Sequence, residues 1–193
     1  MMVILASQSP RRAELLKQID VQFDVHPADI DETLHSGEEP PQYVQRLAIE
    51  KAQSVASLYP GIVLGSDTTV VLDNRVLGKP IDFDHYRGML NALSGQVHHV
   101  VTAVAVTDGV KTLSKVVTTE VEFIELSPDQ IERYWHTGEP SDKAGGYGIQ
   151  GLGAVFVKRI SGSCSSVVGL PLAESADLLV QFDIPVWQSI ATQ

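Results

Sequence analysis

Residues 96–126 read QVHHVVTAVAVTDGVKTLSKVVTTEVEFIEL, two long strand-like runs separated by Asp108 and Gly109. An Asp-Gly pair between two such runs is a strong signal for a turn that joins antiparallel strands. The stretch therefore predicts a long β-hairpin in the middle of the chain. A sheet that contains such a hairpin cannot be built from parallel strands alone.

Strand-like and helix-like segments alternate on both sides of this hairpin. Apolar or alternating runs predict further strands at residues 3–6, 21–27, 61–72 and 154–160. Apolar periodicity and capping residues predict helices at residues 10–18, 41–58, 82–93, 128–137 and 171–182. The order of these segments predicts an α/β protein with a mixed β-sheet.

The composition is typical of a soluble globular protein of ordinary domain size. The chain has 193 residues, of which 44% are hydrophobic, and a formal net charge of −10. No apolar run approaches the roughly 20 residues that a membrane-spanning helix needs, and the acidic charge argues against broad nucleic-acid binding. Its single cysteine allows no disulfide within the chain, and MMVILA is too short for a signal peptide. We therefore predict a cytoplasmic location, with no membrane or nucleic-acid partner.

A basic cluster follows the first predicted strand, in ASQSPRR. Ser9, followed by proline, favours a helix start, where free N–H groups and the helix dipole attract phosphate. Ser7 adds a hydroxyl group, and Arg11 and Arg12 add guanidinium groups that match phosphate oxygens. The arginines could instead be solvated surface charges. An anion site is favoured because two cations at a helix N-terminus oppose the dipole.

Asp67 lies inside GSDTTVVL, within a run predicted to be an inner strand. An unpaired carboxylate there is costly, so Asp67 needs a metal, a cationic partner or a position at a strand end. Small polar neighbours such as Thr68 leave room for a ligand. Glu32 lies in the acidic loop DIDE, whose oxygens suit hard divalent cations, although such loops are usually only solvated.

Other candidate residues are weaker when taken singly. Lys51, on the helix predicted at 41–58, and Lys79, in LGKP, each look like surface residues. DKAGGYGIQGLG contains a formal G-x-G-x-x-G, but it precedes a strand and opens no helix, so a dinucleotide site is rejected. A loop that closes over a ligand is favoured over a flexible turn, with Gln150 reading a base edge and Tyr147 stacking or packing.

Two further features are predicted to be structural. His98 and His99 are neighbours on a predicted strand and so point to opposite faces, which argues against a joint metal site. Cys164 has no recognisable motif around it and is predicted to be a small packing residue.

Several of these motifs occur together in one known family. In order and at matching spacing, the chain carries LASQSPRRAELL, GSDTTVVLDNRVLGKP, SGQVHHVVTAVAV, DKAGGYGIQGLGAVFVKRISGS and VVGLPLAE. This resembles the Maf family of nucleoside triphosphate pyrophosphatases, from Val3 to about Asp183. Thr68 and the YGIQG loop resemble the branch that hydrolyses dTTP and UTP, rather than the branch that acts on 7-methyl-GTP.

The resemblance implies a fold, a reaction and a set of site residues. It implies an elongated mixed sheet flanked by helices, in which residues 1–193 form one catalytic domain with a cleft between two lobes. It implies that dTTP, UTP and related modified pyrimidine nucleotides are cleaved to the monophosphate and pyrophosphate with Mg²⁺ or Mn²⁺. A homodimer is a further expectation from the family. The implied roles are catalysis by Asp67, metal binding by Glu32 and Asp67, and substrate binding by Ser7, Arg11, Arg12, Lys51, Thr68, Lys79 and Gln150.

Two other functions stay open at this point. Phosphatases that use an aspartate as nucleophile also carry this residue at a strand end, followed by threonine. A phosphatase of this kind would release orthophosphate. A nucleotide-sensing regulator of cell division would bind the nucleotide without turnover. The name of the family comes from an effect on septum formation, which keeps this second alternative open.

Overall fold

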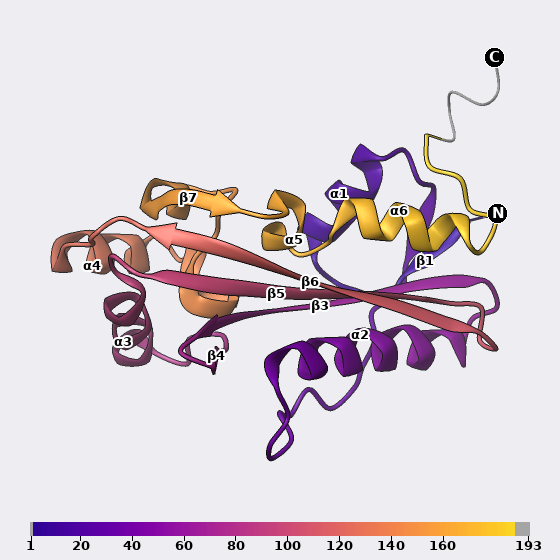
Figure 1. Ribbon diagram of the computed structural model, residues 1–193, viewed down its shortest axis with the longest axis horizontal. Helices are drawn as coiled ribbons and strands as arrows, with labels where there is room; N and C mark the ends of the chain where they lie inside the picture. The colour runs from indigo at the N-terminus through magenta and orange to yellow at the C-terminus, as the bar shows by residue number, and fades with distance from the viewer. Residues whose placement is uncertain (1, 188–193) are drawn as a thin grey trace.

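The computed structural model describes residues 2–187, which form one elongated sheet covered by helices (Figure 1). The strands are β1 (Val3–Leu5), β2 (Phe23–Val25), β3 (Ile62–Leu72), β4 (Arg75–Leu77), β5 (Val97–Thr107), β6 (Thr112–Phe123) and β7 (Val157–Ser161). The α-helices are α1 (Pro10–Gln18), α2 (Pro40–Ala56), α3 (Phe83–Leu93), α4 (Pro128–His136), α5 (Cys164–Val168) and α6 (Leu172–Val180). Three short 3₁₀ helices are η1 (Glu139–Asp142), η2 (Ala144–Gly146) and η3 (Leu152–Phe156). Within residues 2–187, no helix is both long and apolar enough to cross a membrane.

The long strands β3, β5 and β6 are antiparallel neighbours in a seven-stranded mixed sheet. The strand order is β2-β1-β3-β5-β6-β7, and β4 pairs with the end of β3. β1 runs parallel to both β2 and β3, whereas β7 is antiparallel to β6. The predicted hairpin at residues 96–126 forms β5 and β6, and the predicted mixed α/β fold is confirmed.

Helices cover both faces of the sheet at the end where β1 lies (Figure 1). On one face α2 packs against β3 and β5 through small residues that include Ala48 and Ala52. On the opposite face α1 and α6 share a second apolar core with β1 and β3. The close approach of α2 depends on Gly65, because a Cβ there would overlap the carbonyl oxygen of Ala48 and lie 2.8 Å from the nitrogen of Ala52.

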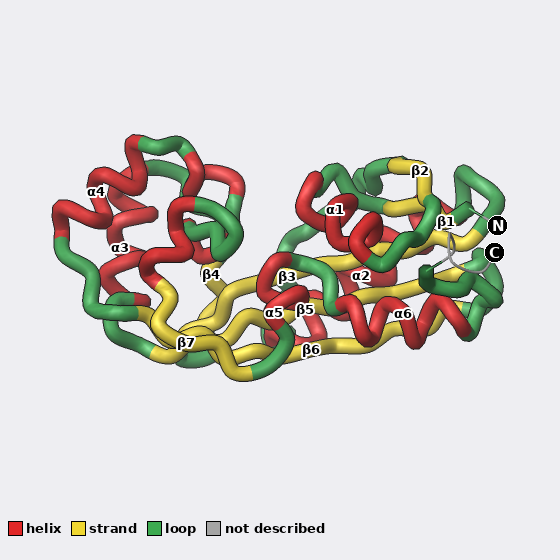
Figure 2. Tube along the Cα trace, turned by 90° about the horizontal axis from the view of Figure 1, so that it is seen from above, coloured by secondary structure: helices red, strands yellow, loops and turns green. Residues whose placement is uncertain are grey.

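A third apolar core lies at the other end of the long strands, around Tyr86, Phe123 and Tyr134. It is built by α3, α4 and the segment after α4. Figure 2 shows these helices gathered at one end and α1, α2 and α6 at the other, with the long strands connecting the two groups. The helices thus form two lobes, and the middle of β3 lies between them.

Two local predictions were wrong, and one short helix was not predicted. The strand predicted at residues 154–160 begins only at Val157, because residues 152–156 form η3. The short helix α5 was not predicted; the Ser163 hydroxyl caps it by accepting the N–H of Ser166. Cys164 is the first residue of that helix and is exposed, so it is not a packing residue.

Candidate active site

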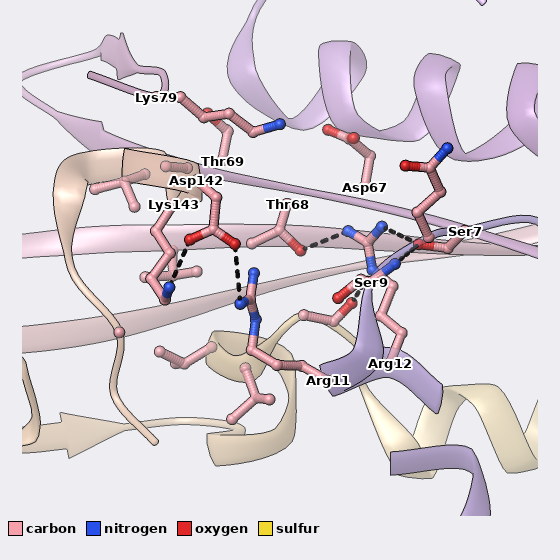
Figure 3. Close-up of a pocket in the computed structure, with 18 of the residues that line it drawn as sticks. Ser7, Ser9, Arg11, Arg12, Asp67, Thr68, Thr69, Lys79, Asp142 and Lys143 are labelled. Carbon is pink, nitrogen blue, oxygen red and sulfur yellow. Dashed lines mark hydrogen bonds and ion pairs between the residues drawn. The ribbon is translucent and has the colours of Figure 1, made fainter. Parts of the chain in front are cut away.

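A cleft of about 900 Å³ lies between the two lobes (Figure 3). Its walls come from the junction of β1 and α1, from α2, from the middle of β3 and from the glycine-rich segment at residues 142–151. The structure brings together in this cleft every residue that the sequence singled out for catalysis, metal or substrate: Ser7, Arg11, Arg12, Glu32, Lys51, Asp67, Thr68, Lys79 and Gln150.

Arg12 is held in place by neutral oxygens from three parts of the chain (Figure 3). Its Nε donates to the carbonyl oxygen of Gly169 at 2.8 Å, Nη1 to Ser7 Oγ at 3.1 Å and Nη2 to Thr68 Oγ1 at 3.4 Å. Burial lowers the pKa of Arg12, with Arg11 adding to this and Asp67 opposing it. A guanidinium nevertheless stays charged at any working pH. The alternative that Arg12 is a freely solvated surface charge was therefore wrong.

Arg11 reaches across the cleft toward the other lobe. Its Nη1 lies 3.6 Å from Asp142 Oδ2, and Asp142 also accepts a hydrogen bond of 2.6 Å from Lys143 Nζ (Figure 3). Partial burial acts to raise the pKa of Asp142, but Lys143 and Arg11 outweigh this effect and lower it. Sequence analysis did not single out Asp142. The available signal was its place beside a lysine at the start of the glycine-rich segment.

Lys51 lies between two carboxylates. Its Nζ is 2.7 Å from Asp67 Oδ1 and 2.6 Å from Glu32 Oε1. Lys51 and Asp67 are each only 8% exposed, whereas about half of the Glu32 side chain is accessible. Lys51 is therefore not the surface residue that the sequence suggested, and Asp67 has the cationic partner that its burial requires.

The two carboxylates bound to Lys51 differ in their electrostatics. Burial raises the pKa of Asp67, although Lys51 and Arg12 oppose the shift. Burial also acts to raise the pKa of Glu32, but there the hydrogen bond and charge of Lys51 prevail and the pKa is lowered. The cleft therefore pairs a Glu32 whose pKa is lowered with an Asp67 whose pKa is raised.

Thr68 points into the cleft next to Asp67 and links Arg12 to the sheet (Figure 3). Its hydroxyl lies 3.0 Å from Thr102 Oγ1 on β5, and Thr102 in turn donates to the carbonyl oxygen of Ser166 at 2.7 Å. This chain of hydroxyl groups connects the arginine to helix α5. Thr68 is therefore tied to the protein as well as open to a ligand.

The glycine-rich segment forms the far wall of the cleft. Gln150 is exposed there, and Lys79 is exposed at the end of β4. Tyr147 is buried, and its hydroxyl lies 2.8 Å from His98 Nε2, so Tyr147 packs in the core and does not offer its ring for stacking. His98 is fully buried and His99 is half-exposed, which confirms that they point to opposite faces.

Sequence reasoning missed two residues that hold this wall in place, one of which, Glu139, also lines the cleft. Glu139 accepts hydrogen bonds from the N–H groups of Leu152 and Gly153, at 2.9 and 3.1 Å. Tyr134, on α4, donates to the same carboxylate at 2.6 Å. These bonds satisfy the N–H groups of the first two residues of η3, which have no partner inside the helix. The signal in the sequence was the cluster of glycines that follows this acidic residue.

The fold and the cleft define an α/β protein whose basic cleft holds a buried lysine–carboxylate pair. The sequence profile described as "Maf-like protein" matches residues 2–182, and the chain belongs to this family. A dTTP/UTP pyrophosphatase of Saccharophagus degradans is 55% identical over 97% of this chain and 91% of the relative. One of Pseudoalteromonas atlantica is 55% identical over 95% of this chain and 98% of the relative. The solved structure of a HAM1 protein from Coxiella burnetii is 19% identical, with a TM-score of 0.48, covering 64% of this chain and 73% of that chain.

Proposed function

We propose that this protein hydrolyses dTTP and UTP between the α- and β-phosphates, releasing the monophosphate and pyrophosphate. The names of relatives that are 55% identical over nearly the whole chain support these substrates. The observation that carries the proposal is the cleft, in which the fixed guanidinium of Arg12 and the Lys51–Asp67 pair line one space. A guanidinium suits phosphate, and a buried carboxylate suits proton transfer.

The phosphates would meet a basic surface that is already ordered. Arg12 would bind them without losing further side-chain freedom, because protein oxygens already fix its orientation. Arg11 would exchange its contact with Asp142 for a phosphate oxygen, and Lys79 would add charge from the segment after β4. Positioning and charge neutralisation are the main requirements of phosphoryl transfer.

The family resemblance implies a divalent cation, and the residues present fit one. Glu32 and Asp67 each place a carboxylate oxygen within 2.7 Å of Lys51 Nζ, so both reach a common point. In residues 2–187 no group of three or more His, Cys, Asp or Glu side chains could hold a metal, so further ligands would come from water or substrate phosphates. When bound by Glu32 and Asp67, Mg²⁺ or Mn²⁺ would offset phosphate charge and polarise a phosphoryl oxygen.

Asp67 would orient the attacking water and accept its proton. Its raised pKa makes it a stronger base than an exposed aspartate, while Lys51 keeps enough of it ionised. The water oxygen forms a bond to phosphorus, and the bond from that phosphorus to the bridging oxygen breaks. The bridging oxygen keeps the electron pair and leaves with the other product, and Asp67 later returns its proton to solvent.

Base selectivity would come from Gln150. Uracil and thymine share an acceptor–donor–acceptor edge, which one amide can read because it both donates and accepts. Cytosine presents an amino group where uracil has a carbonyl, and unpaired polar groups can cost several kcal/mol of discrimination. Purines would be too large for a pocket fitted to one ring.

A panel of nucleotides tests the proposal. We expect dTTP and UTP to give pyrophosphate at comparable rates with Mg²⁺ or Mn²⁺, and CTP, ATP and GTP to react much more slowly. Orthophosphate as the first product would favour a phosphatase, and saturable binding without turnover would favour a regulator. Hydrolysis of CTP as fast as UTP would contradict the role given to Gln150.

Hydrolysis in ¹⁸O-water under single-turnover conditions tests the chemistry. Direct water attack puts the label into a product: into the monophosphate after attack at the α-phosphorus, or into pyrophosphate after attack at the β-phosphorus. Label appearing first on Asp67 would instead establish a covalent aspartyl intermediate and contradict direct attack.

A further inference from the structure

The segment that carries Gln150 is tied down at both ends by side chains outside the cleft chemistry. At its C-terminal end, Glu139 Oε2 accepts the N–H of Leu152 at 2.9 Å and Oε1 accepts the N–H of Gly153 at 3.1 Å. At its N-terminal end, the N–H of Gly148 donates to Tyr134 Oη at 2.9 Å. Gln150 lies midway between the two anchored ends.

Tyr134 and Glu139 connect the two anchors to each other. The Tyr134 hydroxyl donates to Glu139 Oε1 at 2.6 Å while accepting from Gly148, so one hydroxyl serves both ends of the segment. Tyr134 is only 4% exposed and belongs to the apolar core of the second lobe. The segment is therefore fastened to the rigid part of that lobe.

The backbone lies directly on the Glu139 carboxylate. At Gly151 a Cβ would overlap both carboxylate oxygens of Glu139, so a larger residue there would push the carboxylate out of this position. Burial acts to raise the pKa of Glu139, but hydrogen bonds from Tyr134, Leu152 and Gly153 lower it. The carboxylate therefore stays ionised at neutral pH and keeps its full capacity to accept these bonds.

We propose that Glu139 is a positioning residue for base selectivity, which fixes the 148–153 segment so that Gln150 meets the pyrimidine edge. This inference rests on the proposed function, because it assigns the base to Gln150. It separates selectivity from chemistry, since in the part of the chain that the structure describes Glu139 forms no hydrogen bond or ion pair with Asp67 or Lys51, and its hydrogen bonds go to the opposite wall.

Glu139→Gln is the matched perturbation. The amide keeps the size of the side chain, but its NH₂ group cannot accept a backbone N–H. We expect the ratio of kcat/KM for UTP to that for CTP to fall by at least about tenfold, because a displacement of about 1 Å can cost up to a hundredfold. The kcat for UTP should change much less than its KM. Glu132→Gln, an exposed change on α4, should leave the ratio as in the wild type.

A double-mutant cycle with Gln150→Ala separates positioning from general destabilisation. If Glu139 acts through Gln150, adding Glu139→Gln to Gln150→Ala should leave the UTP/CTP ratio unchanged. Equal loss of activity on UTP and CTP, or fully additive effects on the ratio, would overturn the proposal. If Glu139→Gln does not fold, Tyr134→Phe removes one hydroxyl from the same network and takes its place in the cycle.

Hydrogen exchange gives a readout that does not depend on turnover. The amides of Leu152 and Gly153 should exchange faster in Glu139→Gln than in the wild type, and unchanged exchange would refute the anchoring. A wild-type protein that hydrolyses neither UTP nor dTTP would overturn the proposed function and this proposal with it. Wild-type hydrolysis combined with an unchanged ratio in Glu139→Gln would overturn this proposal alone.

Discussion

Replacing Asp67 by asparagine separates chemistry from stability in this cleft. The substitution keeps the size of the side chain and an oxygen that can accept the 2.7 Å hydrogen bond from Lys51. It removes the negative charge, but Lys51 keeps its second partner, Glu32, at 2.6 Å. The ammonium is therefore not left without a counter-charge, which is the usual cause of severe loss when a buried ion pair is broken.

In Asp67→Asn the expected effect on stability is far smaller than the expected effect on turnover. A hydrogen bond between ions is worth only about 1 kcal/mol more than one with a neutral partner. Because burial raises the pKa of Asp67, its charge also costs folding free energy, so the two effects oppose each other and the free energy of unfolding should change by no more than about 1 kcal/mol. The loss of a general base should lower turnover by about 10²–10⁴-fold, or about 3–5 kcal/mol of activation free energy. By contrast, Lys51→Met leaves a buried Asp67 without its ammonium and should cost about 3–5 kcal/mol of stability.

Single-turnover hydrolysis of UTP, together with denaturant unfolding, measures both quantities on the same samples. Nucleotide affinity should be kept or increased in Asp67→Asn, because one negative charge near the triphosphate is gone. Asp177→Asn is a suitable control, since Asp177 also pairs with a lysine, Lys115 at 3.0 Å, but on the exposed surface. A folded Asp67→Asn protein that turns over within tenfold of the wild type would refute the role of Asp67 as base.

Two further predictions concern stability. Burial, helped by the nearby His99, lowers the pKa of His98 to about 4, so the imidazole binds a proton more readily in the unfolded chain than in the folded protein. The free energy of unfolding should therefore be highest above pH 6.5 and fall by up to about 3 kcal/mol toward pH 4. His98→Leu should flatten this slope in denaturant titrations, and His99→Gln should flatten it much less, because burial is the larger cause of the shift; equal slopes in all three proteins would contradict the prediction. Gly65→Ala should lower the free energy of unfolding by about 1–3 kcal/mol, because the added methyl group would push α2 off the sheet. Gly88→Ala, with open space around it, should raise the free energy of unfolding by about 0.5–1 kcal/mol. Thermal melts measure both, and similar effects of the two substitutions would contradict the close packing at Gly65.

The long elements were predictable because their signals are local. β3, β5 and β6 are runs of about a dozen strand-forming residues, and the caps of α1 and α4 lie where serine and proline indicated. The misses, η3 and α5, are five residues each and depend on distant partners. Glu139 holds η3, and α5 is fixed by a hydrogen bond between Thr119 and Ser166 at 2.9 Å. Short segments whose hydrogen bonds go to remote side chains carry little local signal.

The cleft residues were predictable as positions but not as interactions. The sequence placed a buried aspartate and a lysine on separate elements, and only the packing of α2 on β3 shows that Lys51 neutralises Asp67. Likewise the pair of Arg11 and Asp142 joins residues from different lobes. Such contacts depend on the relative placement of whole elements, which periodicity and spacing do not encode.

The cleft is basic in a chain that is acidic overall. Five basic and four acidic side chains line it, against a formal net charge of −10 for the protein. Several of these charges are already paired, Lys51 with Asp67 and Arg11 with Asp142. An arriving triphosphate and its cation would therefore exchange partners with the protein, which avoids the cost of holding isolated ions in a half-buried site.

The two adjacent arginines consequently differ in what they offer a phosphate. Arg11 must give up its ion pair with Asp142, whereas the hydrogen-bond partners of Arg12 are neutral oxygens of Ser7, Thr68 and Gly169. The charges of Asp67 and Glu32 also act on Arg12. Because salt screens exposed charges beyond about 10 Å, the acidic surface repels an anion far less than Arg12 attracts it at contact distance. A strongly acidic protein can thus bind a strongly acidic ligand, provided that one fixed guanidinium with neutral hydrogen-bond partners lies where the phosphates arrive.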